Sequence, residues 1–247
     1  MKRILKRILH RFGYDVVHST TQFDPIRDLT EEQRKIIWAA KPFTMTSIER
    51  MAALVNAVGY VTRNRIPGDI AECGVWRGGS MMVVALTLLA NGDRSRSLYL
   101  YDTFEGMSAP TTADKSPEGI SAQQMLEQAP AGTGIWCYAS LEEVRANIAS
   151  TGYPAEKIHL IKGKVEDTIP GTLPAALSLL RLDTDWYEST KHELLHLYPL
   201  LHRNGILIID DYGDWQGARK AVDEYFENSG VFLHRIDRTG RMVVKTH

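Results

Sequence analysis

The fold is decided by the stretch Gly68-Asp-Ile-Ala-Glu72-Cys-Gly74-Val-Trp-Arg-Gly78-Gly79-Ser80, in which an apolar, strand-forming run passes through glycines into a helix. Such a junction opens an α/β sheet, and its glycines permit a tight turn and a close approach of a ligand to the backbone. The spacing resembles a dinucleotide-binding turn, but the pattern is not G-x-G-x-x-G. Because Glu72 would repel a pyrophosphate at the end of the strand, the junction favours a ligand that carries positive charge.

Strand-like and helical runs alternate on both sides of this junction. Helices are predicted at residues 30–40, where Thr30 and Gln33 can form a capping box, and at 47–62. Strands are predicted at 68–73, 97–101, 157–161, 176–182 and 205–209, with helices at 80–90, 141–150, 189–201 and 216–227. Residues 231–236 and 241–245 are expected to form a β-hairpin. This order predicts an α/β fold: a doubly wound, Rossmann-like parallel sheet with an antiparallel C-terminal hairpin strand and extra N-terminal helices.

Length, charge and cysteine content narrow the class of protein. The 247 residues suffice for one α/β domain with a substantial core. A formal net charge of −1 argues against nucleic acid as a partner, because phosphate binding requires clustered positive charge. Cys73 and Cys137 form neither a metal-ligand pair nor a disulfide framework, so we expect a reducing, cytoplasmic setting.

Basic and apolar side chains alternate at helical spacing over residues 1–12, and residues 1–40 are predicted to form a helical extension ahead of a domain at 41–247. We expect neither a signal peptide, whose long apolar core and cleavage site are missing, nor a membrane span, which needs roughly 20 apolar residues. The basic helix can lie on an anionic membrane surface, or it can dock its apolar stripe on the domain or a second subunit. We favour docking and expect a homo-oligomer.

Two acidic motifs each follow a predicted strand: Leu-Asp183-Thr-Asp185-Trp-Tyr and Ile-Ile-Asp210-Asp211-Tyr. Parallel strands emerge together at their carboxyl ends, which is the edge where open α/β sheets bind ligands. Four carboxylates gathered there would repel one another unless a cation or a proton intervened. Oxygen ligands of this kind suit Mg²⁺ better than Zn²⁺, so the motifs predict a magnesium site. Asp183 and Asp185 would face opposite sides of an extended strand, but a turn at the strand end can bring both into one pocket.

A further carboxylate, Asp102, ends the strand that follows the glycine junction. At this place an acidic residue is suited to accept the hydroxyls of a ribose. A nucleoside whose other end is cationic tolerates Glu72, and S-adenosylmethionine, with its ammonium and sulfonium groups, is such a ligand. Together Glu72 and Asp102, at the ends of adjacent strands, therefore favour S-adenosylmethionine as cofactor.

Between the second strand and the next helix, residues 106–138 are rich in glycine, proline and polar side chains. A loop of this length in a compact domain is usually functional, so we interpret it as a lid over the site, with a disordered surface insertion as the alternative.

The helix predicted at 189–201 carries His192 and His196 at metal-binding spacing. A packed or exposed helical face explains them better, because the acidic residues already supply hard ligands. The aromatic residues near the acidic motifs can stack on a sugar ring or pack in the core: Trp186, Tyr187, Tyr212 and Trp215.

The motifs together resemble one family. The glycine junction, Tyr-Asp102-Thr-Phe-Glu-Gly-Met, Leu-Asp183-Thr-Asp185-Trp-Tyr-Glu-Ser-Thr and Ile-Ile-Asp210-Asp211-Tyr-Gly are similar to those of the macrocin (TylF-type) O-methyltransferases. The resemblance runs from Lys41 to the C-terminus and includes Thr44-Met-Thr-Ser-Ile-Glu-Arg50. It implies a class I methyltransferase sheet on which S-adenosylmethionine and a divalent metal ion methylate sugar hydroxyls of natural products.

The resemblance also implies roles for individual residues. The methionine part of S-adenosylmethionine would be bordered by Glu72, Gly74 and Ser80, with its carboxylate covered by Thr46 and Ser47. Asp102 would hold the ribose, and Asp167 would lie near the adenine, where Glu166 could serve equally. Mg²⁺ would be bound by Asp183, Asp210 and Asp211, and Asp185 would be the general base beside Asp183.

This assignment agrees with the chemistry of a hydroxyl acceptor. A bound cation lowers the pKa of a sugar hydroxyl, a carboxylate can then take the proton, and the sulfonium already activates the methyl group. The implied enzyme is a Mg²⁺-dependent O-methyltransferase whose partner is a small hydroxyl acceptor, such as a sugar or a glycosylated metabolite. Three alternatives remain: methylation of a catechol-like phenol, an NAD-type oxidoreductase or nucleotide-sugar binder on the same sheet, and a non-catalytic module, which the intact aspartates disfavour.

Overall fold

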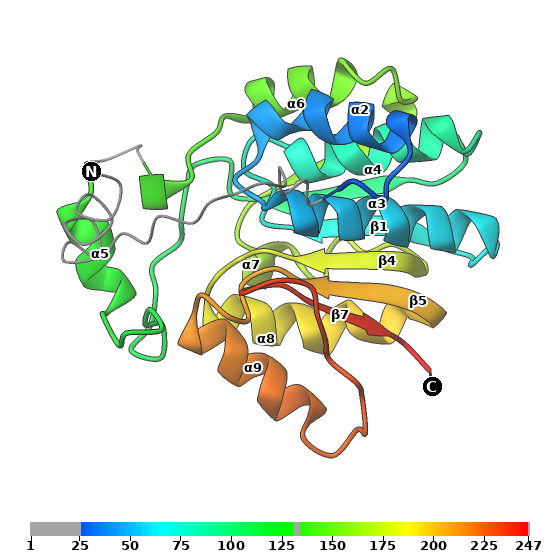
Figure 1. Cartoon of the computed structure of the whole chain (residues 1–247). Helices are drawn as coiled ribbons and strands as arrows, with labels where there is room; N and C mark the ends of the chain where they lie inside the picture. The colour runs from blue at the N-terminus through cyan, green and yellow to red at the C-terminus, as the bar shows by residue number, and fades with distance from the viewer. Residues whose placement is uncertain (1–25, 131–133, 247) are drawn as a thin grey trace, which may run out of the picture.

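A seven-stranded mixed sheet forms the centre of the molecule (Figure 1). The computed structural model describes residues 26–130 and 134–246. The strands are β1 (Asp69–Cys73), β2 (Leu98–Asp102), β3 (Ile158–Lys162), β4 (Leu177–Leu182), β5 (Leu201–Ile209), β6 (His234–Arg235) and β7 (Arg241–Val244), in the order β3-β2-β1-β4-β5-β7-β6. Strands β1 to β5 are parallel and β7 is antiparallel to β5. This confirms the predicted doubly wound sheet with its antiparallel C-terminal strands.

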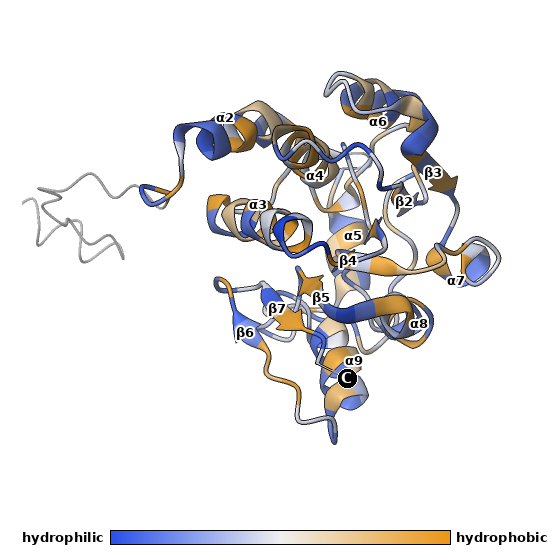
Figure 2. Ribbon diagram, turned by 90° about the vertical axis from the view of Figure 1, so that its right-hand side faces the viewer, coloured by the Kyte–Doolittle hydropathy of each residue, from blue (hydrophilic) through white to orange (hydrophobic). Residues whose placement is uncertain are grey.

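Helices cover both faces of the sheet (Figures 1 and 2). One layer contains α2 (Glu31–Ala40), α3 (Ile48–Arg63), α4 (Gly79–Ala90) and α6 (Leu141–Ala149). The other contains α7 (Val165–Thr168), α8 (Tyr187–His196) and α9 (Gln216–Phe226). The remaining helical elements are η1 (Lys41–Phe43), α5 (Ala122–Gln128), η2 (Gly134–Trp136), η3 (Ala155–Lys157) and η4 (Tyr198–Leu200).

The buried apolar side chains form two clusters, one on each face of the sheet. Met51, Val83 and Val144 belong to the cluster beneath α3, α4 and α6, and Leu194 and Val222 to the cluster beneath α8 and α9. Figure 2 shows hydrophobic colouring on β5 and β7, which lie between the helical layers. Since burial of one large aliphatic side chain contributes roughly 1.5–3 kcal/mol, these two layers account for most of the driving force for folding.

Chain order reverses between β1 and β4, because β2 and β3 lie on one side of β1 while β4 and β5 lie on the other. The connections after β1 and β4 therefore diverge to opposite faces and leave a crevice at the carboxyl ends of these strands. The acidic motifs and the glycine junction all end at this crevice.

The structure differs from the predicted elements at α8 and β5. Helix α8 ends at His196 rather than at residue 201, because Pro199 in η4 prevents continuation of the helix. Strand β5 begins four residues early, at Leu201, and its pairing with β4 shifts between Leu177 and Leu179. At this irregularity, residues 202–204 of β5 are exposed, and Asn204 has φ of +67°.

At the C-terminal hairpin the first strand is shorter than predicted. Only His234 and Arg235 pair as β6, and the preceding Phe232 is 80% exposed. An edge strand with little apolar burial gains few contacts from extension, which explains the short ladder.

At the N-terminal side the capping box is confirmed, since Thr30 Oγ1 accepts from the Gln33 amide and Gln33 Oε1 accepts from the Thr30 amide. The predicted basic helix at 1–12 lies outside the described residues. Helix α2 places Ile36, Ile37 and Ala40 in the same core as α3 and α4. The domain boundary at residue 40 stays a prediction. Within the described ranges, no helix combines the length and apolar character needed to cross a membrane.

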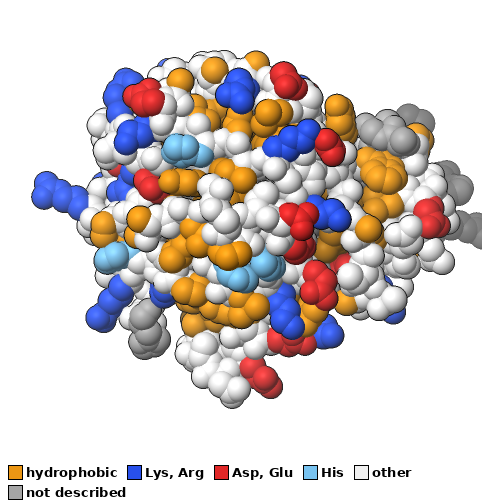
Figure 3. Space-filling model, turned by 180° about the vertical axis from the view of Figure 1, so that it is seen from behind, with side chains coloured by type: hydrophobic (Ala, Val, Ile, Leu, Met, Phe, Trp, Pro, Cys, Tyr) orange, Lys and Arg blue, Asp and Glu red, His pale blue; other side chains and the backbone are white. Residues whose placement is uncertain are grey.

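Exposed large apolar side chains lie on several separate elements: Trp38, Met45, Ile120, Tyr138, Leu195, Phe232 and Val244. Seen from behind, apolar and histidine side chains gather across the middle of the surface between charged residues (Figure 3). The expected homo-oligomer stays a prediction.

Candidate active site

A cavity of about 490 Å³ opens at the carboxyl ends of the central strands. It is lined by Thr46, Gly74, Ser80, Asp102, Asp183, Asp185, Asp210 and Asp211 among the residues singled out from the sequence. The segment 106–138 contributes further lining residues: Gly106, Met107, Ser108, Gly134, Ile135 and Cys137. The structure therefore gathers both acidic motifs, the glycine junction and the inserted segment around one space.

Gly74 allows the ends of β1 and β4 to touch. It has φ of +79°, and a Cβ at this position would lie 1.9 Å from the carbonyl oxygen of Asp183. The contact is fixed on both sides, because the Gly74 amide donates to the carbonyl of Tyr101 and the Asp183 amide donates to that of Cys73, each at 2.9 Å. Only glycine fits this conformation at this separation.

Asp102 ties the end of β2 to the turn after β1. Its Oδ2 accepts from the amides of Val75 (2.6 Å) and Trp76 (3.0 Å), and its Oδ1 accepts from the amide of Phe104 (2.7 Å). Burial raises the pKa of Asp102 even though these amides oppose the rise. A carboxylate held in this way faces the cavity in a fixed orientation and can accept further donors from a ligand.

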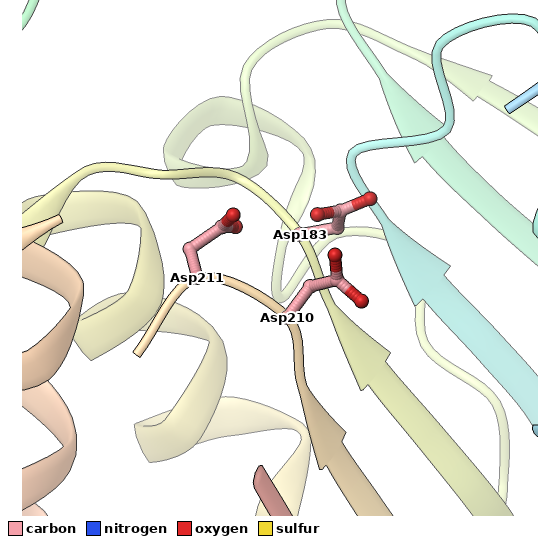
Figure 4. Close-up of side chains that lie close together, drawn as sticks. All are labelled: Asp183, Asp210 and Asp211. Carbon is pink, nitrogen blue, oxygen red and sulfur yellow. The ribbon is translucent and has the colours of Figure 1, made fainter. Parts of the chain in front are cut away.

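The two acidic motifs, one after β4 and one after β5, come together because these two strands are neighbours. Leu182 pairs with Ile209, and the amide of Asp210 donates to the carbonyl of Leu182 at 2.9 Å. Asp183, Asp210 and Asp211 each offer one carboxylate oxygen, and these three atoms lie within 4.8 Å of one another (Figure 4). Among the described residues this is the one group of three or more potential ligands compact enough to share a metal ion.

A buried arginine, Arg181, occupies the centre of this cluster. Its Nη1 lies 2.5 Å from Glu72 Oε1 and 2.7 Å from Asp183 Oδ2, and its Nη2 lies 2.6 Å from Asp210 Oδ1. Thr46 Oγ1 also accepts from Nη2 at 3.0 Å. Sequence reasoning missed Arg181, although a signal was present: an arginine in an apolar strand, two residues before Asp183, shares that residue's face.

A second arginine, Arg50, reaches the cluster from the first turn of α3. It forms ion pairs with Asp210 and, at 3.0 Å, with Asp237 in the turn before β7. Arg50 stands in one of the motifs that resemble the family, but the sequence suggested no partner for it. The cations that acidic residues were expected to need are therefore supplied in part by the chain itself.

Asp185 and Asp211 form a hydrogen-bonded carboxyl pair. Burial and the charge of Asp183 raise the pKa of Asp185 to about 7, although contacts with Asp211 and Trp215 oppose the rise. Burial and the charge of Asp185 raise the pKa of Asp211 well above its ordinary value. Contact between the two carboxyl groups raises the pKa of Asp211 and opposes the rise at Asp185, as expected when Asp211 holds the proton between them.

Asp185 owes its orientation to an uncommon backbone conformation. The residue has φ of +66°, and the amide of Trp186 donates to the carbonyl of Thr184 at 2.7 Å across it. This turn realises the expectation that Asp183 and Asp185 can face one pocket, since both line the cavity.

Three predicted cofactor residues do not line the cavity. Ser47 is the N-cap of α3, where Oγ accepts from the Arg50 amide and donates to Asp237 Oδ2. Glu72, a residue of β1, is fully buried against Arg181, and burial raises its pKa to about 8 although Arg181 opposes the rise. Asp167 lies on the exposed side of the short helix α7, so none of the three is assigned direct contact with a ligand.

Glu166 lies at the cavity where Asp167 does not. Its Oε1 accepts from Ser189 Oγ at 2.9 Å, and both residues line the cavity. Of the two residues considered for the adenine contact, Asp167 and Glu166, the geometry therefore favours Glu166.

The histidines of α8 are engaged within the helix layer. His192 Nε2 is 2.8 Å from the carbonyl oxygen of Ile169, and His196 Nδ1 is 2.8 Å from that of His192. Neither belongs to the acidic ligand group.

The aromatic residues near the acidic motifs have separate roles. Trp186 is buried, whereas Trp215 lines the cavity and packs edge-on against Trp186 at 4.9 Å between ring centroids. Tyr187 and Tyr212 lie off the cavity and donate to Glu224 and Asp223 of α9.

Comparison with known proteins agrees with this geometry. The profile of the Macrocin-O-methyltransferase (TylF) family matches residues 5–245. The chain is 33% identical over 242 residues to 8-demethyl-8-(2,3-dimethoxy-alpha-L-rhamnosyl)-tetracenomycin-C 4'-O-methyltransferase of Streptomyces olivaceus, covering 97% of this chain and 88% of that one. It is 33% identical over 241 residues to Mycinamicin III 3''-O-methyltransferase of Micromonospora griseorubida, covering 96% and 92%.

A solved structure supports the same conclusion. The O-methyltransferase NovP superposes with a TM-score of 0.72 at 32% identity, over 83% of each chain. Calicheamicin methyltransferase CalS11 shares the fold, with a TM-score of 0.56 at 16% identity over 94% and 97% of the chains. The protein is thus an S-adenosylmethionine-dependent O-methyltransferase of the class I fold, and it belongs to the macrocin O-methyltransferase (TylF) family.

Proposed function

We propose that this enzyme transfers the methyl group of S-adenosylmethionine to a hydroxyl of a sugar or glycosylated metabolite, and that the reaction depends on Mg²⁺. The observation that carries the proposal is the compact oxygen triad of Asp183, Asp210 and Asp211 beside Asp185 in the main cavity. The relatives from Streptomyces olivaceus and Micromonospora griseorubida are named for sugar-type positions, 4' and 3''.

The cofactor is assigned to the side of the cavity formed by the ends of β1 and β2. Gly74 and Ser80 border this side and leave room for the methionine part, with Thr46 closing it from the N-terminal direction. Asp102 is proposed to accept the ribose hydroxyls, because its two oxygens are oriented by three amides and lie at the neighbouring strand end. Glu166 is proposed for the adenine contact.

The residues present fit a hard divalent cation. Asp211 Oδ2 is buried without a hydrogen-bond partner among the described residues, as expected for a ligand atom. The carboxylates of Asp183, Asp210 and Asp211, whose ligand atoms lie within 4.8 Å of one another, would hold the ion. Around the site the carboxyl groups outnumber the guanidinium groups of Arg50 and Arg181.

The chain's own residues supply the base and the orientation. When bound, the ion acts as a Lewis acid that lowers the pKa of the acceptor hydroxyl. Asp185 takes the proton of that hydroxyl as the oxygen–carbon bond forms and the carbon–sulfur bond breaks. Asp185 lines the same cavity as the three proposed ligands, which supports its role as base. Met107, Ile135 and Cys137 line the cavity and would help to exclude water from the reacting groups.

Methyl transfer to a panel of acceptors tests this proposal. Glycosides with vicinal hydroxyls and simple catechols are incubated with S-adenosylmethionine and Mg²⁺, before and after treatment with EDTA. We expect methylation of a glycoside that EDTA abolishes and Mg²⁺ restores. Transfer to catechols alone would indicate a phenol methyltransferase, and EDTA-resistant transfer would refute the metal. In a parallel dialysis experiment, tighter binding of NAD than of S-adenosylmethionine would refute the cofactor assignment.

A further inference from the structure

The helices that follow the two acidic motifs lack caps of their own. Helix α8 begins at Tyr187 after Trp186, and α9 begins at Gln216 after Trp215. In both cases the N-cap residue is a tryptophan, which has no side-chain acceptor for the first amides of the helix. Amides at a helix start need an acceptor from outside the helix, such as water or another part of the chain.

Two consecutive residues of the inserted segment supply these acceptors. Asp114 Oδ1 accepts from the amide of Tyr187 at 2.7 Å, and the carbonyl of Lys115 accepts from the amide of Gln216 at 2.9 Å. The side-chain amide of Gln216 also donates to the carbonyl of Ser116 at 2.9 Å. A single corner of the segment therefore caps the helix behind each acidic motif.

Asp114 is built into this corner. It is fully buried, and its Oδ2 accepts from the amide of Thr111 at 2.6 Å and from Thr111 Oγ1 at 2.9 Å. The carboxylate thus connects the fold of the inserted segment to the start of α8, where negative charge is also favoured by the helix dipole. Gly217 of α9 leaves the necessary space, because a Cβ there would lie 1.9 Å from Asp114 Oδ1.

The inserted segment also packs against Trp186, the residue that follows the proposed base Asp185. Ala122 and Leu126 of α5 pack on Trp186, whose indole N–H donates to the carbonyl of Ser108 at 3.0 Å. Asp185 lies between Thr184 and Trp186, two residues before the amide that Asp114 caps. Asp114 itself does not line the cavity, so any effect it has on the reaction passes through this loop.

We propose that Asp114 is a positioning residue: by capping α8 from the inserted segment, it fixes the loop that carries Asp185. The proposal rests on the proposed function of Asp185 as base. A base displaced by about 1 Å can lower the rate by as much as about 100-fold, whereas the cofactor side of the cavity, on β1 and β2, is not touched by this corner.

Asp114→Ala tests the proposal when kcat and cofactor binding are measured separately. We expect kcat to fall about 10- to 100-fold while the Kd for S-adenosylhomocysteine stays within about 3-fold. Thr111→Val is the matched control, because it removes a hydroxyl that donates to the same carboxylate and leaves the Tyr187 contact, so kcat should change less than about 3-fold. Asp114→Asn keeps an acceptor for Tyr187 and should recover part of kcat.

Gly217→Ala provides a second route to the same contact should Asp114→Ala fail to fold. It keeps the carboxylate but displaces it from the other side, and we expect the same selective fall in kcat. Equal losses of kcat and of cofactor binding in these variants would overturn the proposal, because they would indicate general damage to the fold. Unchanged kcat in Asp114→Ala would also overturn it.

Hydrogen exchange separates this proposal from the proposed function. In Asp114→Ala, amides of residues 183–190 should exchange faster than in the wild type, while those of β1 and β2 should not change. If the wild type transfers no methyl group, the proposed function fails, and hydrogen exchange alone then tests whether Asp114 caps α8. Unchanged exchange over 183–190 would then refute the capping role, and selective acceleration would support it.

Discussion

The carbonyl oxygen of Asp183 lies against Gly74, where a side chain would approach it to 1.9 Å. This contact brings the glycine junction and the first acidic motif into one site, so the cofactor side and the acidic side of the cavity share a boundary. Any side chain at residue 74 must separate β1 from β4 or distort the turn.

Gly74→Ala is expected to abolish activity and to weaken binding of S-adenosylhomocysteine at least 10-fold, because the positive φ costs about 1–2 kcal/mol and the clash adds to it. Calorimetric binding and thermal unfolding measure both effects. Gly92→Ala is the matched control, since Gly92 has a similar φ of +73° but nothing within 4 Å of its added Cβ. Equal losses in the two variants would show that backbone strain alone, rather than contact with Asp183, is responsible.

Asp185→Asn should lower kcat about 100- to 10,000-fold while cofactor binding is retained, because the amide cannot take the acceptor's proton. The fold should persist, since the amide can still hydrogen-bond with Asp211 and Trp215. Single-turnover methyl transfer and a binding titration check the two statements. Asp223→Asn on the surface of α9 should leave kcat unchanged, and near-normal turnover by Asp185→Asn would remove the residue as base.

Asp211→Asn should raise the Mg²⁺ concentration needed for half-maximal activity at least 10-fold, because one of the three proposed ligands can no longer ionise. Without added metal, the variant should be at least as stable as the wild type, since a buried carboxyl without full hydrogen bonding is removed. Activity as a function of Mg²⁺ and thermal unfolding in EDTA test these outcomes. The double variant Asp210→Ala with Asp211→Ala should no longer respond to Mg²⁺, and an unchanged metal dependence would exclude both residues as ligands.

Asp237→Asn should make stability less dependent on acidic pH. Burial alone would raise the pKa of Asp237, but hydrogen bonds from Ser47 and from the amides of Gly240 and Thr239 lower it to about 2. A depressed pKa contributes stability that is present above the unfolded value of about 4 and is lost as pH falls from about 4 to about 2.

With partial solvent screening the contribution at neutral pH is about 1–2 kcal/mol. Urea unfolding at pH 7 and pH 2.5 measures it. The variant should be less stable than the wild type at pH 7 and should approach it at pH 2.5. Glu156→Gln on the exposed turn η3 should follow the wild type at both values. A deficit of the same size at both pH values would show that lost packing, not charge, causes the destabilisation.

Local patterns predicted the strands and the acidic residues well because both follow from the chain itself. A buried parallel strand is a continuous apolar run, and its first charged residue marks the edge where ligands bind, so Asp102, Asp183 and Asp210 could be placed by inspection. The capping box at Thr30 is local in the same way. The short β6 could not be foreseen, because strand length at an edge depends on what covers it.

The partners of charged residues were not predictable. Arg181, Arg50 and Asp114 act through contacts that span many residues of sequence, and each depends on which strands and loops become neighbours. The same limit explains Ser47 and Glu72, whose side chains are engaged by Asp237 and Arg181 and so do not reach the cavity. The type of a residue and its position in a motif indicate that it lies near a site. Its role there depends on which other side chains bind its polar atoms in the folded protein.

The guanidinium of Arg181 has one more consequence. A site whose anions are partly balanced by permanent internal counter-charges does not need its ion in order to hold its shape. On the proposed magnesium dependence, chelation should abolish methyl transfer without unfolding the protein, and added Mg²⁺ should restore activity without a refolding step.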